Sequence, residues 1–330
     1  MATKREAYLC LTAMLRVRET RLLTEERAQR MLDAPSFEEA AKLLTDCGYP
    51  DLSLSGAEEI EAVLAERRDA MLADLSALAP EKAIVGAFRV KYDYHNVKAI
   101  LKSEAQGIDP ARLLVRSGRV SPDALLEAYR EGRYNDLPGA LGKAMEEARG
   151  VLARTANPQL ADLLLDQSCF AEMKAAAEEA GSPFLAGYVR LLIDSTNLKS
   201  AVRTLRMHKD ADFLQRVLLT GGEIDPERIA AANDRESLTA LYASGKLAAA
   251  AALGAEAAAG GAQTAFERAC DNAVIAYLRE AKLVGYGAEP LIGYLAAVEN
   301  ELTAVRMILT GRLAGIAPET IRERLRDFYA

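Results

Sequence analysis

The stretch KYDYHNVKAILK at residues 91–102 recurs, with several residues substituted, at two later points of the chain. LIDSTNLKSAVR occupies residues 192–203, and AVENELTAVR occupies residues 297–306. Each copy holds an asparagine followed six residues later by a basic side chain, in the pairs Asn96 and Lys102, Asn197 and Arg203, and Asn300 and Arg306. The asparagines lie 101 and 103 residues apart, which indicates an internal repeat of similar units.

An aspartate precedes the asparagine by three residues in the first two copies, and the third copy has Ala297 there. Residues three apart share one helix face, so the pair can hydrogen-bond locally or to a neighbouring helix and fix the packing of each unit. Alternatively, these polar groups line a shared surface that meets a partner, and the sequence leaves both interpretations open. The candidate anchor or contact residues are Asp93, Asn96, Lys102, Asp194, Asn197, Arg203, Asn300 and Arg306.

A second marker follows each copy: GIDP at 107–110, EIDP at 223–226 and GIAP at 315–318. In the first two, aspartate is a good N-cap and proline a good first helical residue. Two markers in the same order predict three helical units, at residues 1–105, 106–215 and 216–330. The opening helix and the last residues are expected to complete one unit between them, which would close the three units into a ring or funnel.

The composition favours an all-α fold. The chain of 330 residues contains 62 Ala and 46 Leu but only 15 Val and 12 Ile, and no Trp. Ala and Leu favour helices, whereas Val and Ile favour strands. Helical periodicity broken by Gly and Pro predicts long helices at 5–23, 55–78, 80–102, 157–180, 184–207, 264–284 and 290–309. Ser55 and Glu58 have the spacing of a capping box for the second of these.

Charge and apolar patterning exclude several classes of protein. The net charge of −7 argues against a dedicated nucleic-acid binder, which is normally strongly basic. The four cysteines form no CxxC pair and, with no secretory signal apparent in MATKREAYLC, suit a reducing compartment. No apolar run approaches the roughly 20 residues needed to cross a bilayer. We therefore expect no nucleic-acid partner and no direct insertion into a membrane.

Catalytic motifs are missing from the sequence. There are two histidines, His95 and His208, and neither belongs to an HExxH or a His/Cys cluster typical of a metal site. No GxxxxGK[ST] phosphate-binding loop and no GxSxG nucleophile motif is present. We therefore expect no catalytic residue, no metal and no cofactor, and a protein that is not an enzyme.

The repeat motifs carry a family resemblance. KYDYHNVKAILK, IDSTNLKSAVRT and the ending ENELTAVRMILTGRLAGIAPETIRERL resemble the C subunit of the V-type and A-type ATP synthases, whose eukaryotic counterpart is the d subunit of the V-ATPase. The opening AYLCLTAMLRVRETRLL, followed by SFEEAAKLLTDCGY, is also similar to the start of that family. The resemblance covers essentially the whole chain, and its specificity lies in the order and spacing of the motifs.

The resemblance implies a funnel of three pseudo-equivalent helical units with approximate three-fold symmetry. It implies a non-catalytic central-stalk rotor subunit, peripheral on the cytoplasmic face of the membrane. There it would join the central-shaft subunits to the membrane rotor ring and transmit torque for ion transport coupled to ATP synthesis or hydrolysis. Two alternatives stay open: a generic α-helical repeat scaffold for protein assembly, and a helical enzyme with a buried polar site.

Overall fold

The computed structural model describes residues 5–330, which form helices and connecting turns with no strand among them. The expected all-α class is confirmed. The sixteen α-helices are α1 (Leu9–Glu19), α2 (Glu25–Asp33), α3 (Phe37–Lys42), α4 (Ala57–Leu78), α5 (Lys82–Gln106), α6 (Pro122–Glu131), α7 (Leu141–Thr155), α8 (Pro158–Ala180), α9 (Pro183–Arg206), α10 (Ala211–Val217), α11 (Pro226–Ala231), α12 (Arg235–Tyr242), α13 (Ala248–Ala258), α14 (Gln263–Arg279), α15 (Ala288–Leu313) and α16 (Pro318–Arg324).

Side-chain N-caps mark eight of the sixteen α-helix starts. Asn157 caps α8 and Ser182 caps α9, and each stands just before a proline that is the first residue of the helix. The side chain of each accepts a hydrogen bond from a backbone N–H of the first turn. The expected capping box at Ser55 does not form: α4 begins after Gly56, without a side-chain cap. The first helix is also shorter than expected, because a 3-10 turn precedes α1 and α1 ends at Glu19.

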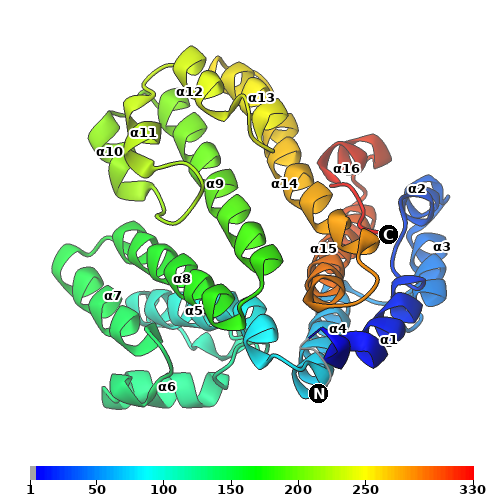
Figure 1. The fold of residues 1–330 in the computed structure, drawn as a ribbon. Coiled ribbons are helices and arrows are strands. Elements are labelled where there is room, and N and C mark those ends of the chain that lie inside the picture. The colour runs from blue at the N-terminus through cyan, green and yellow to red at the C-terminus, as the bar shows by residue number, and fades with distance from the viewer. Residues whose placement is uncertain (1–4) are drawn as a thin grey trace.

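The helices pack in three groups around the middle of the molecule (Figure 1). Group I comprises α5 to α8, group II comprises α9 to α14, and group III combines α15 and α16 with α1 to α4. Each group begins with one of the long helices that carry the repeated asparagine. The chain therefore passes between groups at the breaks near residues 80, 182 and 285. These packing groups differ from the divisions expected at 106 and 216, which remain predictions about the sequence repeat, as does the three-fold funnel.

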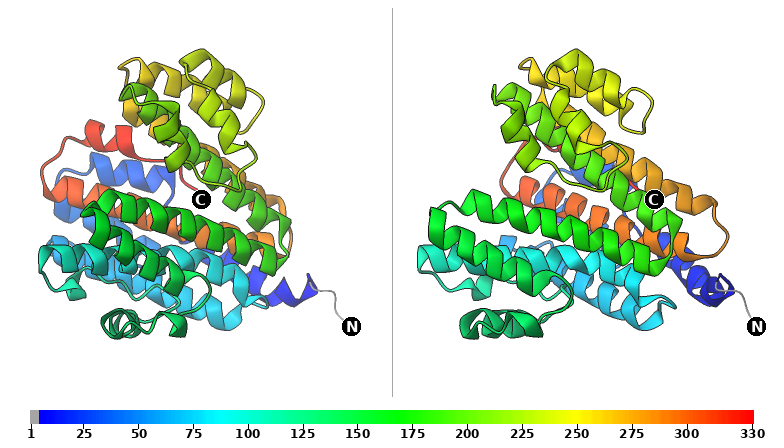
Figure 2. Two further views of the ribbon diagram at one scale, coloured as in Figure 1. Left: turned by 90° about the vertical axis from the view of Figure 1, so that its left-hand side faces the viewer. Right: turned by 60° about the vertical axis from the view of Figure 1, so that its left-hand side comes forward.

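Both ends of the chain contribute to group III. The buried carboxylate of Glu301, on α15, accepts hydrogen bonds from Leu23 N at 2.6 Å and the Tyr49 hydroxyl at 2.8 Å. It also pairs with the Arg67 guanidinium of α4 at 3.0 Å. A carboxylate taken out of water must be compensated in this way. Glu301 therefore joins three N-terminal segments to the C-terminal long helix. Figure 2 shows the blue N-terminal helices beside the orange and red helices of the C-terminal part.

Candidate functional site

The repeated asparagines bind the segment that returns along each long helix. Asn96 donates to Val115 O and accepts from Val115 N, both at 2.8 Å. Asn197 makes the same pair with Leu219, at 2.9 and 2.8 Å. Each amide side chain bonds both the N–H and the C=O of one residue, as a neighbouring strand would. The buried polar groups of both partners are thereby satisfied. Both asparagines are fully buried inside their groups.

The third copy divides this role between two residues. Asn300 donates to Asp327 O at 2.8 Å, and the N–H of Asp327 donates to the side chain of Asn272, on α14, at 2.9 Å. The segment held here is the end of the chain, and it is held by side chains of groups II and III together. The degraded third motif therefore still fixes a returning segment.

The aspartates bind the next residues of the same returning segments. Asp93 accepts Val120 N at 3.1 Å and the Arg119 guanidinium at 2.6 Å. Asp194 accepts Glu223 N at 2.9 Å and Ile224 N at 3.3 Å. Burial raises the pKa of both carboxyl groups, against the lowering effect of these hydrogen bonds. Ala297 replaces the carboxylate in the third copy and is itself buried.

The three basic residues of the motif differ in their surroundings. Lys102 pairs with Asp162 of α8 at 2.7 Å, and Arg306 pairs with Glu61 of α4 at 2.6 and 2.9 Å. Arg203 is exposed and makes no ion pair within the described part of the chain, residues 5–330. Surface ion pairs contribute little to stability, so Lys102 and Arg306 can exchange partners at small cost.

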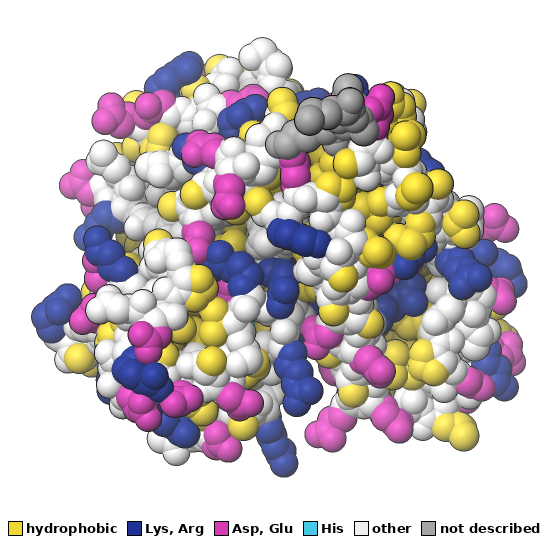
Figure 3. Space-filling model, turned by 60° about the horizontal axis from the view of Figure 1, so that its bottom comes forward, with side chains coloured by type: hydrophobic (Ala, Val, Ile, Leu, Met, Phe, Trp, Pro, Cys, Tyr) yellow, Lys and Arg dark blue, Asp and Glu magenta, His cyan; other side chains and the backbone are white. Residues whose placement is uncertain are grey.

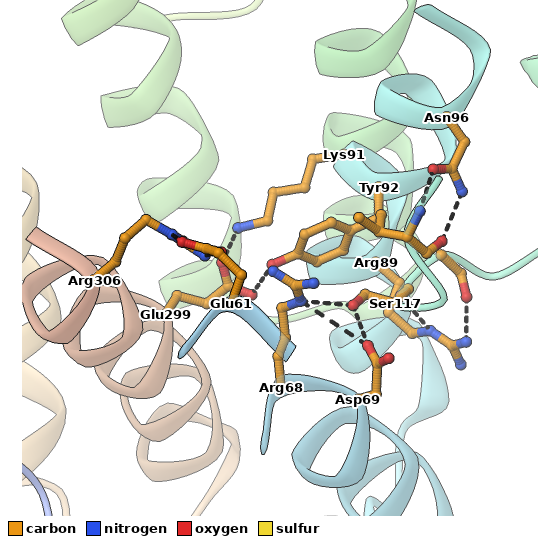
Figure 4. Close-up of polar contacts among 12 residues, drawn as sticks. Glu61, Arg68, Asp69, Arg89, Lys91, Tyr92, Asn96, Ser117, Glu299 and Arg306 are labelled. Atoms are coloured by element: carbon orange, nitrogen blue, oxygen red, sulfur yellow. Dashed lines mark hydrogen bonds and ion pairs between the residues drawn. The ribbon is translucent and has the colours of Figure 1, made fainter. Parts of the chain in front are cut away.

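The long helices meet at a polar junction in the middle of the molecule (Figure 4). Glu299, on α15, accepts hydrogen bonds from Lys91 and Tyr92 of α5. One turn earlier on α5, Phe88 stacks on Tyr188 of α9, with ring centroids 5.5 Å apart. Burial, followed by the charge of Glu299, raises the pKa of both Tyr92 and Tyr188. Two residues of the first motif, Lys91 and Tyr92, are thus linked to the helix of the third.

Sequence reasoning missed Glu299 as a junction residue. It directly precedes Asn300, at the position that His95 and Thr196 occupy in the other copies. The signal was available, because this position changes charge between copies while the asparagine beside it is constant. Its partners, however, lie 208 and 207 residues away in the chain, and no local pattern identifies them.

A second polar link joins groups I and III. The Arg68 guanidinium, on α4, donates to the Ser117 hydroxyl at 2.6 Å, and Ser117 donates to Asp69. From group I itself, Arg89 donates to Ser117 O at 3.1 Å (Figure 4). The loop after α5 is therefore held from both groups.

At one end of the molecule the three breaks between groups come together. Glu81, Gly181, Ser182 and Ala288 line a single hollow of about 200 Å³. Arg16 of α1 donates to Val284 O at 2.8 Å, so α1 lies against the third break. Figure 3, in which the bottom of the Figure 1 view comes forward, shows hydrophobic side chains gathered in the upper right part of that face. The large exposed ones on α1 and the third break are Leu9, Val17, Leu283 and Tyr286, and Leu283 is 89% exposed.

Comparison with known proteins places this sequence in a family. The family model of the ATP synthase (C/AC39) subunit matches residues 11–324. The chain belongs to the ATP synthase (C/AC39) subunit family. It is therefore a subunit of a V/A-type ATPase.

Curated relatives of the ATP synthase (C/AC39) subunit family match over most of the chain. The chain is 24% identical to the C subunit of the V-type sodium ATPase of Enterococcus hirae, over 98% of this chain and 99% of that protein. It is 24% identical to the C subunit of the A-type ATP synthase of Methanocaldococcus jannaschii, over 96% of this chain and 86% of that protein. It is 27% identical to the C subunit of the V-type ATP synthase of Thermus thermophilus, over 59% and 62% respectively.

The described residues of this ATP synthase (C/AC39) family member contain neither a candidate metal-binding cluster nor a candidate membrane-spanning helix. His95 and His208 are exposed, and within residues 5–330 no three His, Cys, Asp or Glu side chains are placed to hold a metal ion. Over the same residues, no helix combines the length and the apolar composition that a membrane span requires. What the arrangement does is join three helix groups through buried and half-buried polar contacts.

Proposed function

We propose that this chain is the non-catalytic central-stalk rotor subunit of its ATPase. In this role it is a socket that joins the central-shaft subunits to the membrane rotor ring, on the cytoplasmic face. It passes torque between them for ion transport coupled to ATP synthesis or hydrolysis. The observation that carries the proposal is the packing of α15, which contacts helices of all three groups.

Such packing suits a mechanical coupler for a physical reason. The long helices α5, α9 and α15 have 25, 24 and 26 residues, and each is about 37 Å long at about 1.5 Å per residue. Contacts join group I to II through α8 and α9, group II to III through α14 and α15, and group III to I through α15 and α5. A load applied to any one group is therefore shared with the other two, and no single hinge carries it.

The two kinds of surface suggest which partner each one binds. We assign the exposed apolar end with Leu9, Val17 and Leu283 to the rotor ring, because contiguous exposed apolar side chains mark interaction sites. We assign the basic residues of the repeated motif, Lys102, Arg203 and Arg306, to the shaft. Exposed charges at an interface chiefly govern association rate and specificity.

Binding measurements test the proposal. Purified protein is expected to form stable complexes with the shaft subunits of its ATPase and, separately, with detergent-solubilised rotor ring. If the protein bound neither the shaft subunits nor the rotor ring, the proposed role would be overturned.

Charge reversal tests the assignment of the basic residues. The triple change Lys102→Glu, Arg203→Glu and Arg306→Glu should weaken shaft binding about tenfold or more at low salt, with little loss of stability because all three side chains lie at the surface. Calorimetric titration against the shaft subunits measures the affinity, and thermal unfolding checks the fold. Arg203→Glu alone is the cleaner single change, since it leaves the ion pairs of Asp162 with Lys102 and of Glu61 with Arg306 intact. Unchanged affinity in the triple variant would restrict these residues to structural roles.

A further inference from the structure

A hollow of about 350 Å³ lies between α5, α8 and α9, at the seam of groups I and II. Its walls are largely apolar and aromatic, formed by Phe88, Phe170, Met173, Tyr188 and Leu192. Cys169 contributes a thiol whose pKa burial raises to about 12, so this thiol stays protonated and behaves as a small apolar group. A volume of this size accommodates a bulky side chain.

The charges at the mouth of this pocket are balanced within the protein. Lys98 pairs with Asp166 at 2.6 Å, and Lys91 pairs with Glu299. An incoming charged group would have to break one of these pairs or lie unpaired in an apolar site, and both are costly. The pocket therefore favours an uncharged apolar occupant over a carboxylate or an amine.

The place of the pocket in the fold connects it with the function. Lys91 lines it and also contacts Glu299 of α15, so the pocket adjoins the junction of all three long helices. The seam beneath it is held by the stacked rings of Phe88 and Tyr188. The seam between groups II and III, by contrast, is joined by Arg326 to Asp271 at 2.8 Å and by the Asn272–Asp327 hydrogen bonds. The seam between groups I and II has a polar link of its own, from the Gln167 side chain to Arg216 O at 3.0 Å, but no ion pair crosses it among the described residues. A partner group in the pocket would add contacts to this seam.

We propose that this pocket receives an apolar side chain, of the size of Leu or Phe, from the foot of the central shaft. The inference rests on the proposed rotor function and specifies one contact within it. Buried apolar anchors in desolvated pockets commonly dominate the affinity of an interface, while surrounding charges set the approach. One seated side chain would hold groups I and II against the shaft.

A pocket-filling variant tests the proposal. Cys169→Leu adds apolar volume inside the pocket without a charge, and should weaken binding of the purified shaft subunits at least tenfold. The matched control is Val274→Leu on α14, because Val274 follows Asp271 by three residues as Cys169 follows Asp166, and both side chains are 7% exposed. The control should leave the affinity within about twofold. Titration calorimetry gives the affinities, and thermal unfolding of each variant verifies the fold.

A second variant covers the case in which Cys169→Leu does not fold. Leu192→Ala enlarges the pocket and removes contacts with the occupant, so shaft binding should fall several-fold while binding to solubilised rotor ring is unchanged. If folded variants bind the shaft as the unaltered protein does, the pocket proposal is overturned and the rotor function stands. If the variants no longer bind the rotor ring but still bind the shaft subunits, the proposed occupant of the pocket is wrong. If the unaltered protein binds neither shaft nor ring, the rotor function itself fails.

Discussion

Groups I and II place an aspartate at the same point of a long helix and compensate it in different ways. In group I, Asp93 pairs with Arg119, whose guanidinium also reaches Glu172 at 2.8 Å. Tyr94 donates to the second oxygen of Glu172 at 2.9 Å. In group II, Asp194 is 4% exposed and is held by two backbone N–H groups, with no ion pair inside the described residues.

The returning segments account for the difference. Gly118-Arg119-Val120 passes Asp93, and Gly222-Glu223-Ile224 passes Asp194. A Cβ at either glycine would collide with the aspartate oxygen, so both segments need Gly there. The middle residue changes from Arg to Glu, and a hollow of about 380 Å³ lined by Asp194, Glu223 and Tyr277 opens in group II. Backbone hydrogen bonds are therefore the shared part of the anchor, and the buried ion network is an addition of group I.

The largest expected effect comes from removing the cation of group I. Arg119→Met leaves Asp93 and Glu172 buried without their shared partner, which should destabilise the protein by about 3–5 kcal/mol. The matched change in group II, Glu223→Met, should cost less than about 1 kcal/mol, since Glu223 is exposed. Chemical denaturation of both variants measures the difference. Equal losses would show that the two groups do not differ energetically at this point.

The asparagine anchors should give the next largest effects. Asn96→Ala and Asn197→Ala each remove two hydrogen bonds and leave buried backbone groups of Val115 or Leu219 unsatisfied, at a cost of about 2–4 kcal/mol. Asn300→Ala removes one bond at a half-buried site and should cost about 1 kcal/mol. Denaturant titrations of the three variants rank them. A third variant as damaging as the first two would contradict the division of that anchor between Asn300 and Asn272.

Installing the missing cation in group II should have a smaller effect of opposite sign. Glu223→Arg puts a guanidinium at the position that Arg119 occupies in group I, beside Asp194, and should stabilise the protein by about 1 kcal/mol. Glu223→Gln removes the negative charge without adding a positive one. If the glutamine variant is stabilised as much as the arginine variant, relief of repulsion between carboxylates, and not a new ion pair, explains the gain.

The pH dependence of stability should show the smallest effect. Burial raises the pKa of Asp194 above its usual value of about 3.9, so the folded state holds this proton more tightly than the unfolded state. The protonated carboxyl of Asp194 contributes fully to the free energy of unfolding when the pH lies below the usual pKa. This contribution is lost as the pH rises through the raised pKa of the folded state. Compared with Asp194→Asn, the unaltered protein should therefore be relatively most stable in acid, and its advantage should shrink toward neutral pH. Thermal unfolding of both proteins across this range tests the sign, and an advantage that grows with pH would contradict it.

Local spacing predicted much of the fold and one part of the candidate site. The Ala and Leu excess indicated an all-α protein. The helix predicted over 157–180 is α8, with Asn157 as its N-cap, and the helix predicted from residue 184 begins one residue earlier, at Pro183. The repeat located Asn96 and Asn197. The Ser55 capping box failed because Gly56, not Ser55, occupies the N-cap position of α4. Signals that act over three or four residues can be read from the sequence, but their exact register depends on how the helix packs.

The helical class, the internal repeat and the asparagines that anchor it follow from residue order, because they depend on helix periodicity and on contacts within about 30 residues. The membership of the three groups, the burial of Glu301, the Glu299 junction and the pocket at the seam of groups I and II depend on how distant helices pack. Glu301 and Leu23 are 278 residues apart, and Glu299 and Lys91 are 208 apart. Such contacts form only when entire helices have packed, so the chemistry of each residue alone does not identify its partner.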